Sequence, residues 1–295
     1  MELFIQLLIA GLSLGGIYAL LSFSFSLIIS TTRVLNIAHG VFFLWGAAVF
    51  SILWLHIKLT FPIAFICMIL FFTGLGLLFY WGIVRLLMSK DPHYLLSGSV
   101  LATFGLALAM ESIMAAGWVA YINPQPTFLL PMDLPPLNFI GTMIPSNRLI
   151  VLVLGGVMIL GFHLLLKKTF LGRSARAMAQ NQEGFMVLGL NPQRVTMFMI
   201  LTAILATALA GILYALVIPL DAYEGLPITL KALTVMILAG VGSLPGTMAA
   251  GVLLGLAEVI GAYYLGAIWA PMISFVLLFL VLLVRPTGLF GRVTI

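Results

Sequence analysis

Two glycine-rich patterns in the chain have the spacing of catalytic or phosphate-binding turns. GLSLG at 11–15 matches the nucleophile elbow, in which a strand-to-helix turn would expose Ser13 as an attacking hydroxyl. GVGSLPG at 240–246 resembles a phosphate-binding loop, but it lacks the Lys-Ser/Thr pair of a P-loop. Both patterns lie in long apolar runs without a preceding strand. They therefore indicate helix packing and a helix break, and not catalysis.

The titratable side chains are few and scattered. The four histidines, at positions 39, 56, 93 and 163, form no pair four residues apart and have no cysteine nearby, so no metal site is expected. His39, in NIAHG, is expected at the cytoplasmic end of the second apolar run, as an interfacial residue that bonds backbone freed by a break. Glu111 and Glu258 lie inside apolar runs, with no Lys or Arg expected at mid-membrane to pair with them. Each is therefore either protonated and hydrogen-bonded or faces a wet cavity.

The composition indicates whether this protein lies in water or in a membrane. Of the 295 residues, 63% are hydrophobic and only 7% are charged, whereas soluble domains are about a quarter charged. Such a chain could not cover a globular surface with polar groups, which excludes a cytosolic enzyme, a secreted domain, a disordered tail and a nucleic-acid binder. The single cysteine, Cys67, excludes a disulfide framework and a thiolate metal cluster. The protein belongs in a bilayer.

About nine apolar runs are candidates for helices that cross a hydrocarbon core of ~30 Å. Only helices are expected, because an open sheet is not tolerated in lipid and no run alternates like a barrel strand. The first run is predicted to be a retained span and not a cleaved signal, because no Lys or Arg precedes Arg33. The runs cover residues 3–29, 37–55, 62–84, 97–118, 149–166, 195–218, 228–241, 247–265 and 268–284.

The seventh run departs from the others. Its 14 or so residues are too short to cross, and it ends in a Gly/Pro break, typical of broken helices beside the path of a transporter. A tilted or partly unwound span is the alternative. GLSLG and GVLLG (251–255), like the breaks NIAHG and VGSLPG, indicate a possible inverted repeat. The predicted fold is an all-α polytopic membrane protein with about 8–9 transmembrane segments, forming one permease domain over residues 1–295.

The distribution of basic residues predicts the orientation. With the N-terminus outside, the cytoplasmic loops hold ten Lys and Arg residues and the external loops hold three, Lys58, Arg148 and Lys231. This asymmetry predicts an external N-terminus and a cytoplasmic C-terminus. The ten are Arg33, Arg85, Lys90, Lys167, Lys168, Arg173, Arg176, Arg194, Arg285 and Arg292.

Two connections are too long to be turns. The external stretch of about 119–147 contains six prolines and one charge, Asp133, which favours an ordered, extended lid. The cytoplasmic stretch of about 167–194 contains a predicted helix with Asn181 as N-cap, Gly189 just past its end and Pro192 as a stop. It carries Phe185, Met186 and Leu188, which favours docking into a groove of a partner. The alternative is an amphipathic helix lying on the membrane.

Several blocks of sequence resemble one family of transport proteins. GRSARAMAQNQEGFMVLGLNPQRV, followed by ALAGILYAL, is similar to the cytoplasmic coupling segment of branched-chain amino acid ABC-transporter permeases of the LivH-like subfamily. GGIYALL, LNIAHG, KALTVMILAGVGSLPGTMAAGVLLGLAE and VRPTGLFG agree, and the blocks run from residue 11 to 291. Ala239 and Thr247 depart from the pattern, standing where the family usually has Gly and Ala.

The resemblance implies one permease subunit, not itself an enzyme, of an ATP-driven importer in the bacterial inner membrane. Its partners would be a second, LivM-like permease, two ABC ATPase subunits and a periplasmic substrate-binding protein. This chain would bind no cofactor and no metal, because ATP and magnesium would be held by the ATPases. The residues expected to couple to the ATPases are Arg173, Arg176, Asn181, Phe185, Met186, Leu188 and Gly189. The residues expected at the translocation path or the helix breaks are Asn36, His39, Gly40, Gly240, Gly242, Ser243 and Glu258.

Three other functions fit parts of the sequence. A self-contained channel or secondary transporter would explain the broken helix and the intramembrane acids, but it does not need an exposed coupling segment. A urea or short-amide ABC permease shares the subfamily pattern. A membrane-embedded enzyme is disfavoured, because no His/Asp/Ser or metal constellation is present.

Overall fold

The computed structural model describes residues 2–88, 92–122, 127–130, 134–139, 142–240 and 242–291. Eight helices in this part of the chain are long and apolar enough to cross a membrane, and a ninth apolar helix, α10 (Gly225–Ala239), is shorter. The prediction of 8–9 helical spans with one short member is confirmed. Lys90, Asp133, Val241, Arg292 and the prolines at 124, 126 and 131 lie outside the described residues.

The helices from α1 to α5 follow one another with short connections. α3 continues through η2 and α4 as a single span, Phe61–Met88, and α2 continues through the wider turn η1 to His56. The elements are α1 (Glu2–Thr32), α2 (His39–Ser51), η1 (Ile52–His56), α3 (Phe61–Phe79), η2 (Tyr80–Val84), α4 (Arg85–Met88), α5 (Pro92–Tyr121) and α6 (Ser146–Lys168).

The second half contains the two short helices of the predicted coupling segment and the helix break that the sequence predicts. α7 (Phe170–Gln180) and α8 (Gln182–Val187) are short, and α9 (Pro192–Ala215) is the most buried of the spans. α10 is followed by α11 (Leu244–Leu265), the short η3 (Ala267–Trp269) and α12 (Ala270–Val284). α7 was not predicted as a separate helix. Thr169 begins it by accepting a hydrogen bond from the Gly172 N–H.

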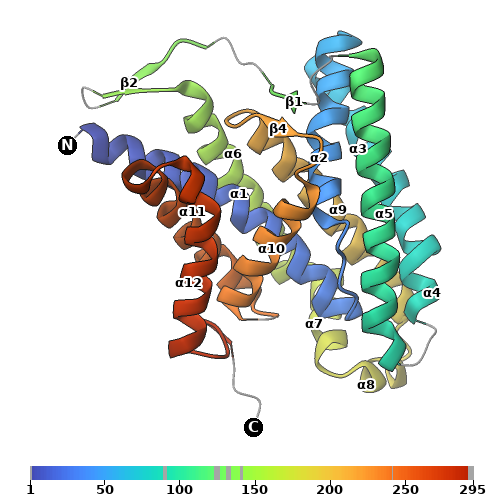
Figure 1. The fold of residues 1–295 in the computed structure, drawn as a ribbon. Helices are drawn as coiled ribbons and strands as arrows, with labels where there is room; N and C mark the ends of the chain where they lie inside the picture. Colours follow the sequence, from blue (N-terminus) through green and yellow to red (C-terminus); the bar gives the residue numbers. More distant parts are fainter. Residues whose placement is uncertain are drawn as a thin grey trace.

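The connection between α5 and α6 is extended, as its prolines predict, but it also forms strands that were not expected. β1 (Thr127–Phe128) pairs with β4 (Leu220–Asp221), and β2 (Leu137–Phe139) pairs with β3 (Thr142–Ile144), both antiparallel. The Gln6 amide donates to the carbonyl of Met143 at 3.1 Å. Figure 1 shows these strands at the same end of the molecule as the N-terminus, with α7 and α8 at the opposite end.

α1 crosses the centre of the molecule and packs most extensively against α11, while α9 packs against α1 and α2. The glycines of GLSLG and GVLLG meet in the first of these contacts. A Cβ atom on Gly255 would lie 2.3 Å from the Gly15 N atom, and one on Gly15 would lie 2.7 Å from the Val252 Cα atom. Both glycine pairs therefore serve one helix crossing, which explains their similarity by packing. Ser13 donates to the carbonyl of Ala10 within α1, so the nucleophile-elbow pattern is helical.

Candidate functional site

The first helix break is an extended segment between α1 and α2. Its backbone groups need partners, because water is absent from the bilayer core. Side chains of neighbouring spans supply them. Thr103 accepts from the Ile37 N–H at 2.9 Å, Ser99 accepts from the Leu35 N–H at 3.3 Å, and Thr229 donates to the Ile37 carbonyl at 2.8 Å. Three hydroxyl side chains on two helices therefore hold the break in place.

His39 is the first residue of α2, and its ring is buried between helices. Its Nε2 atom is 2.9 Å from the Ser24 hydroxyl, 3.0 Å from the Thr207 hydroxyl and 3.3 Å from the Leu21 carbonyl. Ser24 lies eight residues before the end of α1, about 12 Å along that helix. The ring is fully buried and contacts a backbone carbonyl, as the expected structural role at the start of the helix requires, while its position at the membrane interface stays a prediction.

Asn36 and Gly40 flank this histidine. The Asn36 side chain is buried and accepts a hydrogen bond from the Ala38 N–H at 3.1 Å, which turns the chain into α2. Gly40 allows α2 to touch the start of α10, because a Cβ atom there would lie 2.0 Å from the Gly225 carbonyl oxygen. Its N–H donates to Thr229 at 2.8 Å. The first break and the short helix α10 are therefore in direct contact.

The second break lies between α10 and α11. Gly240 and Gly242 have φ angles of +95° and +83°, which favour glycine, and Ser243 begins α11 by accepting from the Gly246 N–H. The segment after α12 closes the end of α10. Its Leu289 and Phe290 N–H groups donate to the carbonyls of Leu238 and Ala239, both at 2.9 Å. The VRPTGLFG block thus satisfies carbonyls that the end of a helix leaves free.

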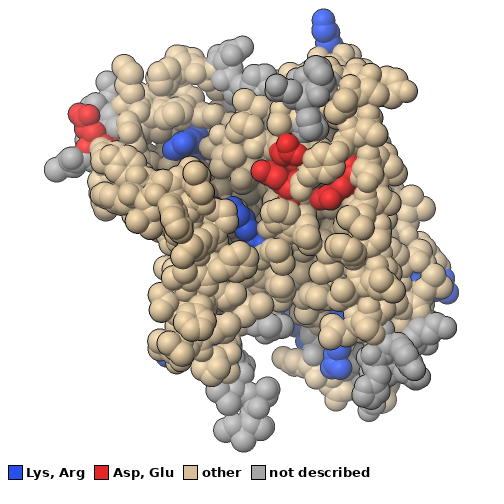
Figure 2. All heavy atoms as spheres, in the orientation of Figure 1, with Lys and Arg blue, Asp and Glu red and all other residues tan. Residues whose placement is uncertain are grey.

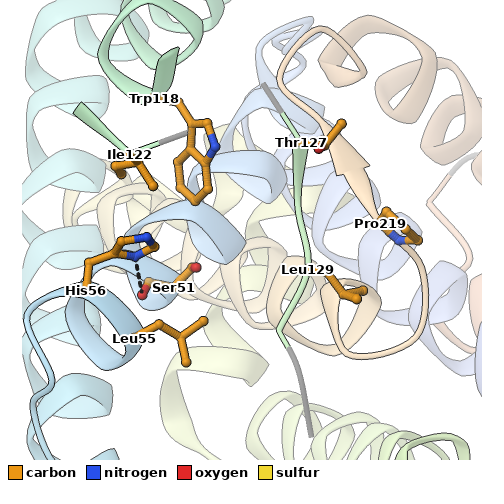
Figure 3. Close-up of a pocket in the computed structure, with 8 residues that line it drawn as sticks. All are labelled: Ser51, Leu55, His56, Trp118, Ile122, Thr127, Leu129 and Pro219. Atoms are coloured by element: carbon orange, nitrogen blue, oxygen red, sulfur yellow. Dashed lines mark hydrogen bonds between the residues drawn. The ribbon is translucent and has the colours of Figure 1, made fainter. Parts of the chain in front are cut away.

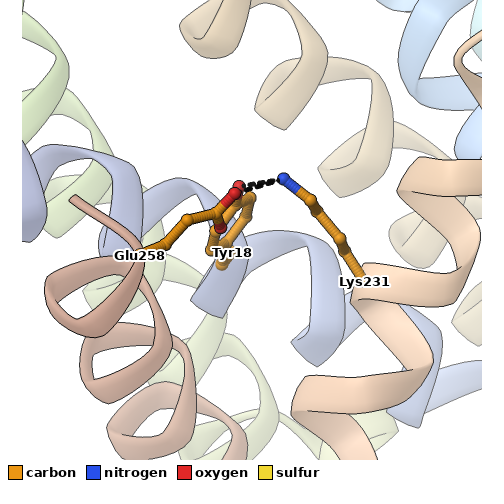
Figure 4. A network of polar contacts seen from close by, with 3 residues as sticks. All are labelled: Tyr18, Lys231 and Glu258. Carbon is orange, nitrogen blue, oxygen red and sulfur yellow. Dashed lines mark hydrogen bonds and ion pairs between the residues drawn. The ribbon is translucent and has the colours of Figure 1, made fainter. Parts of the chain in front are cut away.

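One ion pair lies within the bundle and corrects the prediction that no basic residue pairs with Glu258. The Lys231 ammonium, on α10, donates to Glu258 Oε1 at 2.6 Å and to the Tyr18 hydroxyl at 2.8 Å (Figure 4). The side chain of Lys231 is 21% exposed and that of Glu258 is 7% exposed. Lys231 is therefore no external loop residue, and the external count of basic residues falls to two.

This ion pair limits what can cover its face of the molecule. A Lys side chain at the bilayer centre costs at least about 2.5–3.5 kcal/mol, so intramembrane charges face a bundle interior or a water-filled space. In Figure 2 a basic group is visible near the centre of the molecule, and acidic groups lie close to it. The partly exposed lysine therefore disfavours lipid directly against this part of the face.

Three acids surround the outer end of α10. The Glu111 carboxyl lies against the Gly225 and Leu226 N–H groups, the first of that helix, where the helix dipole favours a negative charge. Burial, together with the nearby charge of Asp221, raises the pKa of the Glu224 carboxyl above its ordinary value. The three acids therefore gather at the N-terminal end of α10, where burial shifts Glu224 toward its neutral form.

A separate pocket of about 320 Å³ lies between η1, α5 and the β1–β4 pair (Figure 3). The rings of His56 and Trp118 meet edge to face in it, 5.9 Å apart. None of the residues predicted for the site lines it. The lining residues are Ser51, Leu55, His56, Trp118, Ile122, Thr127, Leu129 and Pro219.

The predicted coupling helix forms as α8, capped by the Asn181 side chain, which accepts from the Gly184 N–H at 2.9 Å. Gly189 follows it with a φ of +73°. Pro192 does not stop this helix but begins the next, α9. On α7, the Arg176 guanidinium donates to the carbonyl of Leu166, while Arg173 is exposed.

The side chain of Phe185 corrects the prediction that this ring faces the cytoplasm. It is only 2% exposed and packs in a cluster with Leu166, Met178 and Met199. The exposed apolar side chains belong to the three residues that follow Phe185. Met186 is half exposed, Val187 is 87% exposed and Leu188 is 75% exposed. Phe185 therefore anchors α8 to the bundle, and the next three residues form the free apolar surface.

Several residues that hold these features were missed at the sequence level. Thr207 and Thr229 look like ordinary polar residues of spans, and Lys231 was assigned to a loop because it lies close to the start of an apolar run. Their one signal was the presence of a polar side chain among apolar ones. In the described part of the chain, no three metal-ligating side chains come together.

The eight candidate spans, the short apolar helix α10 and the largely buried ion pair define a polytopic helical membrane protein. Residues 7–283 match the family described as branched-chain amino acid transport system / permease component, and the chain belongs to this family. It is a LivH-like, multi-pass membrane transport permease.

Relatives cover nearly the whole chain. The permease protein BraD of the high-affinity branched-chain amino acid transport system of Pseudomonas aeruginosa is 28% identical, over 98% of this chain and 96% of its own. The corresponding LivH protein of Escherichia coli (strain K12) is 25% identical over the same shares. The autoinducer 2 import system permease protein LsrC of Yersinia enterocolitica is 29% identical over 70% of this chain and 52% of its own. No solved structure matches the chain.

Proposed function

We propose that the chain is one permease subunit of an ATP-driven ABC importer for branched-chain or related amino acids. It lies in the bacterial inner membrane, pairs with a second, LivM-like permease, and receives substrate from a periplasmic binding protein. Two ATPase subunits bind its cytoplasmic helices and hold the ATP and magnesium. The observation that carries this proposal is the match to branched-chain amino acid permeases over nearly the full chain.

Two features of the molecule support this assignment of separate roles to the permease, the ATPases and the binding protein. The exposed residues Val187 and Leu188 offer an apolar contact to another protein at one end of the bundle. At the other end the two strand pairs, with exposed side chains such as Leu137 and Met143, offer a surface to a partner outside the bundle. A self-contained carrier has no need for the first of these surfaces.

Deleting the gene is expected to abolish high-affinity uptake of leucine, isoleucine or valine by the source organism, because the importer would lose half of its path. Uptake of radiolabelled amino acids measures this, with urea as a second substrate. Complementation by the tagged chain is the control, and the tag should recover two ATPases and a second permease from detergent extracts. Lost uptake of urea alone would favour an amide permease, and recovery of no ATPase would favour a self-contained carrier.

We propose an external N-terminus and a cytoplasmic C-terminus, on the ten-to-two distribution of basic residues that remains once Lys231 is excluded. A reporter that is active only in the periplasm is expected to stay silent when fused after Ile295. The same reporter inserted after Leu137, in the external connection, should be active. The opposite pair of signals would invert the topology and place α8 outside the cell.

A further inference from the structure

The Lys231–Glu258 pair uses only part of its hydrogen-bonding capacity. The ammonium group has three N–H donors, of which two meet Tyr18 and Glu258, and no third partner occurs among the described residues. Glu258 Oε2 is buried and likewise has no hydrogen-bond partner in that part of the chain. The Lys231 ammonium therefore keeps one unused N–H donor, beside the unused oxygen Oε2 of the Glu258 carboxyl.

We propose that this pair is a subsite for the zwitterionic backbone of an α-amino acid in transit, an inference that rests on the proposed function. The substrate carboxylate binds Lys231 Nζ, and the substrate ammonium binds Glu258. An α-amino acid carries its two charges on groups joined to one carbon atom. It can therefore lie antiparallel to the protein's own ion pair and form two new ion pairs with it.

The exchange suits the membrane interior because it leaves no charge unpaired. Each of the four charged groups has an opposite partner before and after the substrate arrives, and the net charge of the site stays zero. Tyr18 accepts a second hydrogen bond from the ammonium of Lys231, at 2.8 Å beside Glu258, so the lysine keeps one protein partner when the substrate competes for Glu258. An uncharged amide such as urea offers neither of the two ion pairs, so this subsite favours zwitterions over amides.

The position of Lys231 leaves its side chain partly accessible. It is the seventh residue of α10 and is 21% exposed, whereas Glu258 beside it is 7% exposed. Glu224 lies two helical turns earlier on α10, and the charges of Lys231 and Glu224 interact.

The test separates this role from a purely structural ion pair by removing both charges together. The double variant Lys231→Met, Glu258→Gln leaves no unpaired charge, so a structural role predicts little change, since replacing a buried pair by neutral groups is often harmless. We expect instead that leucine uptake by cells of the source organism falls at least about tenfold. The amount of chain in the membrane and the copurified subunits should stay within about twofold of wild type. Lys231→Arg, which keeps the charge, should retain more uptake than the double variant.

Each outcome decides the proposal. Normal leucine uptake by the double variant overturns it, and so does failure of that variant to reach the membrane, which would make the pair structural. If wild-type cells import none of the branched-chain amino acids through this chain, the proposed function fails and the subsite falls with it. If wild type imports leucine and the variants do so equally well, the subsite alone is wrong.

Discussion

Replacing Val187 and Leu188 by alanine is expected to remove the ATPase subunits from the purified complex while the chain reaches the membrane at its normal level. Both side chains are largely exposed at the end of α8, so the fold of this chain does not depend on them. Fully burying such a side chain in a partner's groove contributes roughly 1.5–3 kcal/mol, or about ten- to a hundredfold in affinity for each. A pull-down through a tag on this chain measures the loss.

Two variants complete this experiment. Leu137→Ala removes an exposed apolar side chain at the opposite end of the molecule and should leave ATPase recovery unchanged. Phe185→Ala should behave differently from both, because its ring is inside the bundle and its removal costs about 3–5 kcal/mol of packing. We expect less chain in the membrane as well as less ATPase. Full recovery of ATPase from the Val187, Leu188 variant would contradict docking through α8.

Replacing Gly255 by alanine is expected to disrupt the bundle, because the new methyl group would lie 2.3 Å from the N atom and 2.4 Å from the Cα atom of Gly15. Both contacts are with backbone, which cannot rotate away as a side chain can. Overpacking of this kind costs typically 1–3 kcal/mol, and here the crossing of α1 and α11 would have to separate. The fraction of folded protein that survives heating in detergent, followed by size-exclusion chromatography, measures the change.

Gly16→Ala is the matched control, since it lies beside Gly15 in α1 and a Cβ atom there meets no other atom within 4 Å. Alanine is favoured over glycine inside a helix by about 1 kcal/mol, so this variant should be as stable as wild type or slightly more stable. Equal thermal stability of the Gly255 and Gly16 variants would show that the two helices do not approach as closely as the structure has them.

The sequence by itself determined that the protein lies in a membrane, that it is helical, that it has 8–9 spans, and where both helix breaks lie. Each of these depends on a local property that a short window contains, such as the length of an apolar run or the presence of Gly and Pro. The cap of α8 was readable for the same reason, because Asn181 contacts the N–H group only three residues later. The family followed from blocks of sequence spread over the whole chain.

The tertiary structure decided which side chains meet and which faces remain open. Lys231 and Glu258 are 27 residues apart on two helices, and His39 and Thr207 are 168 residues apart. Neither pairing depends on the residues beside each partner in the chain, because it is set by how the helices rotate and cross. The same holds for Phe185, whose burial beneath α7 and α9 requires helices that enclose it. Apolar character predicts that a side chain will leave water, but only the packed bundle determines whether it does so inside this chain or against another.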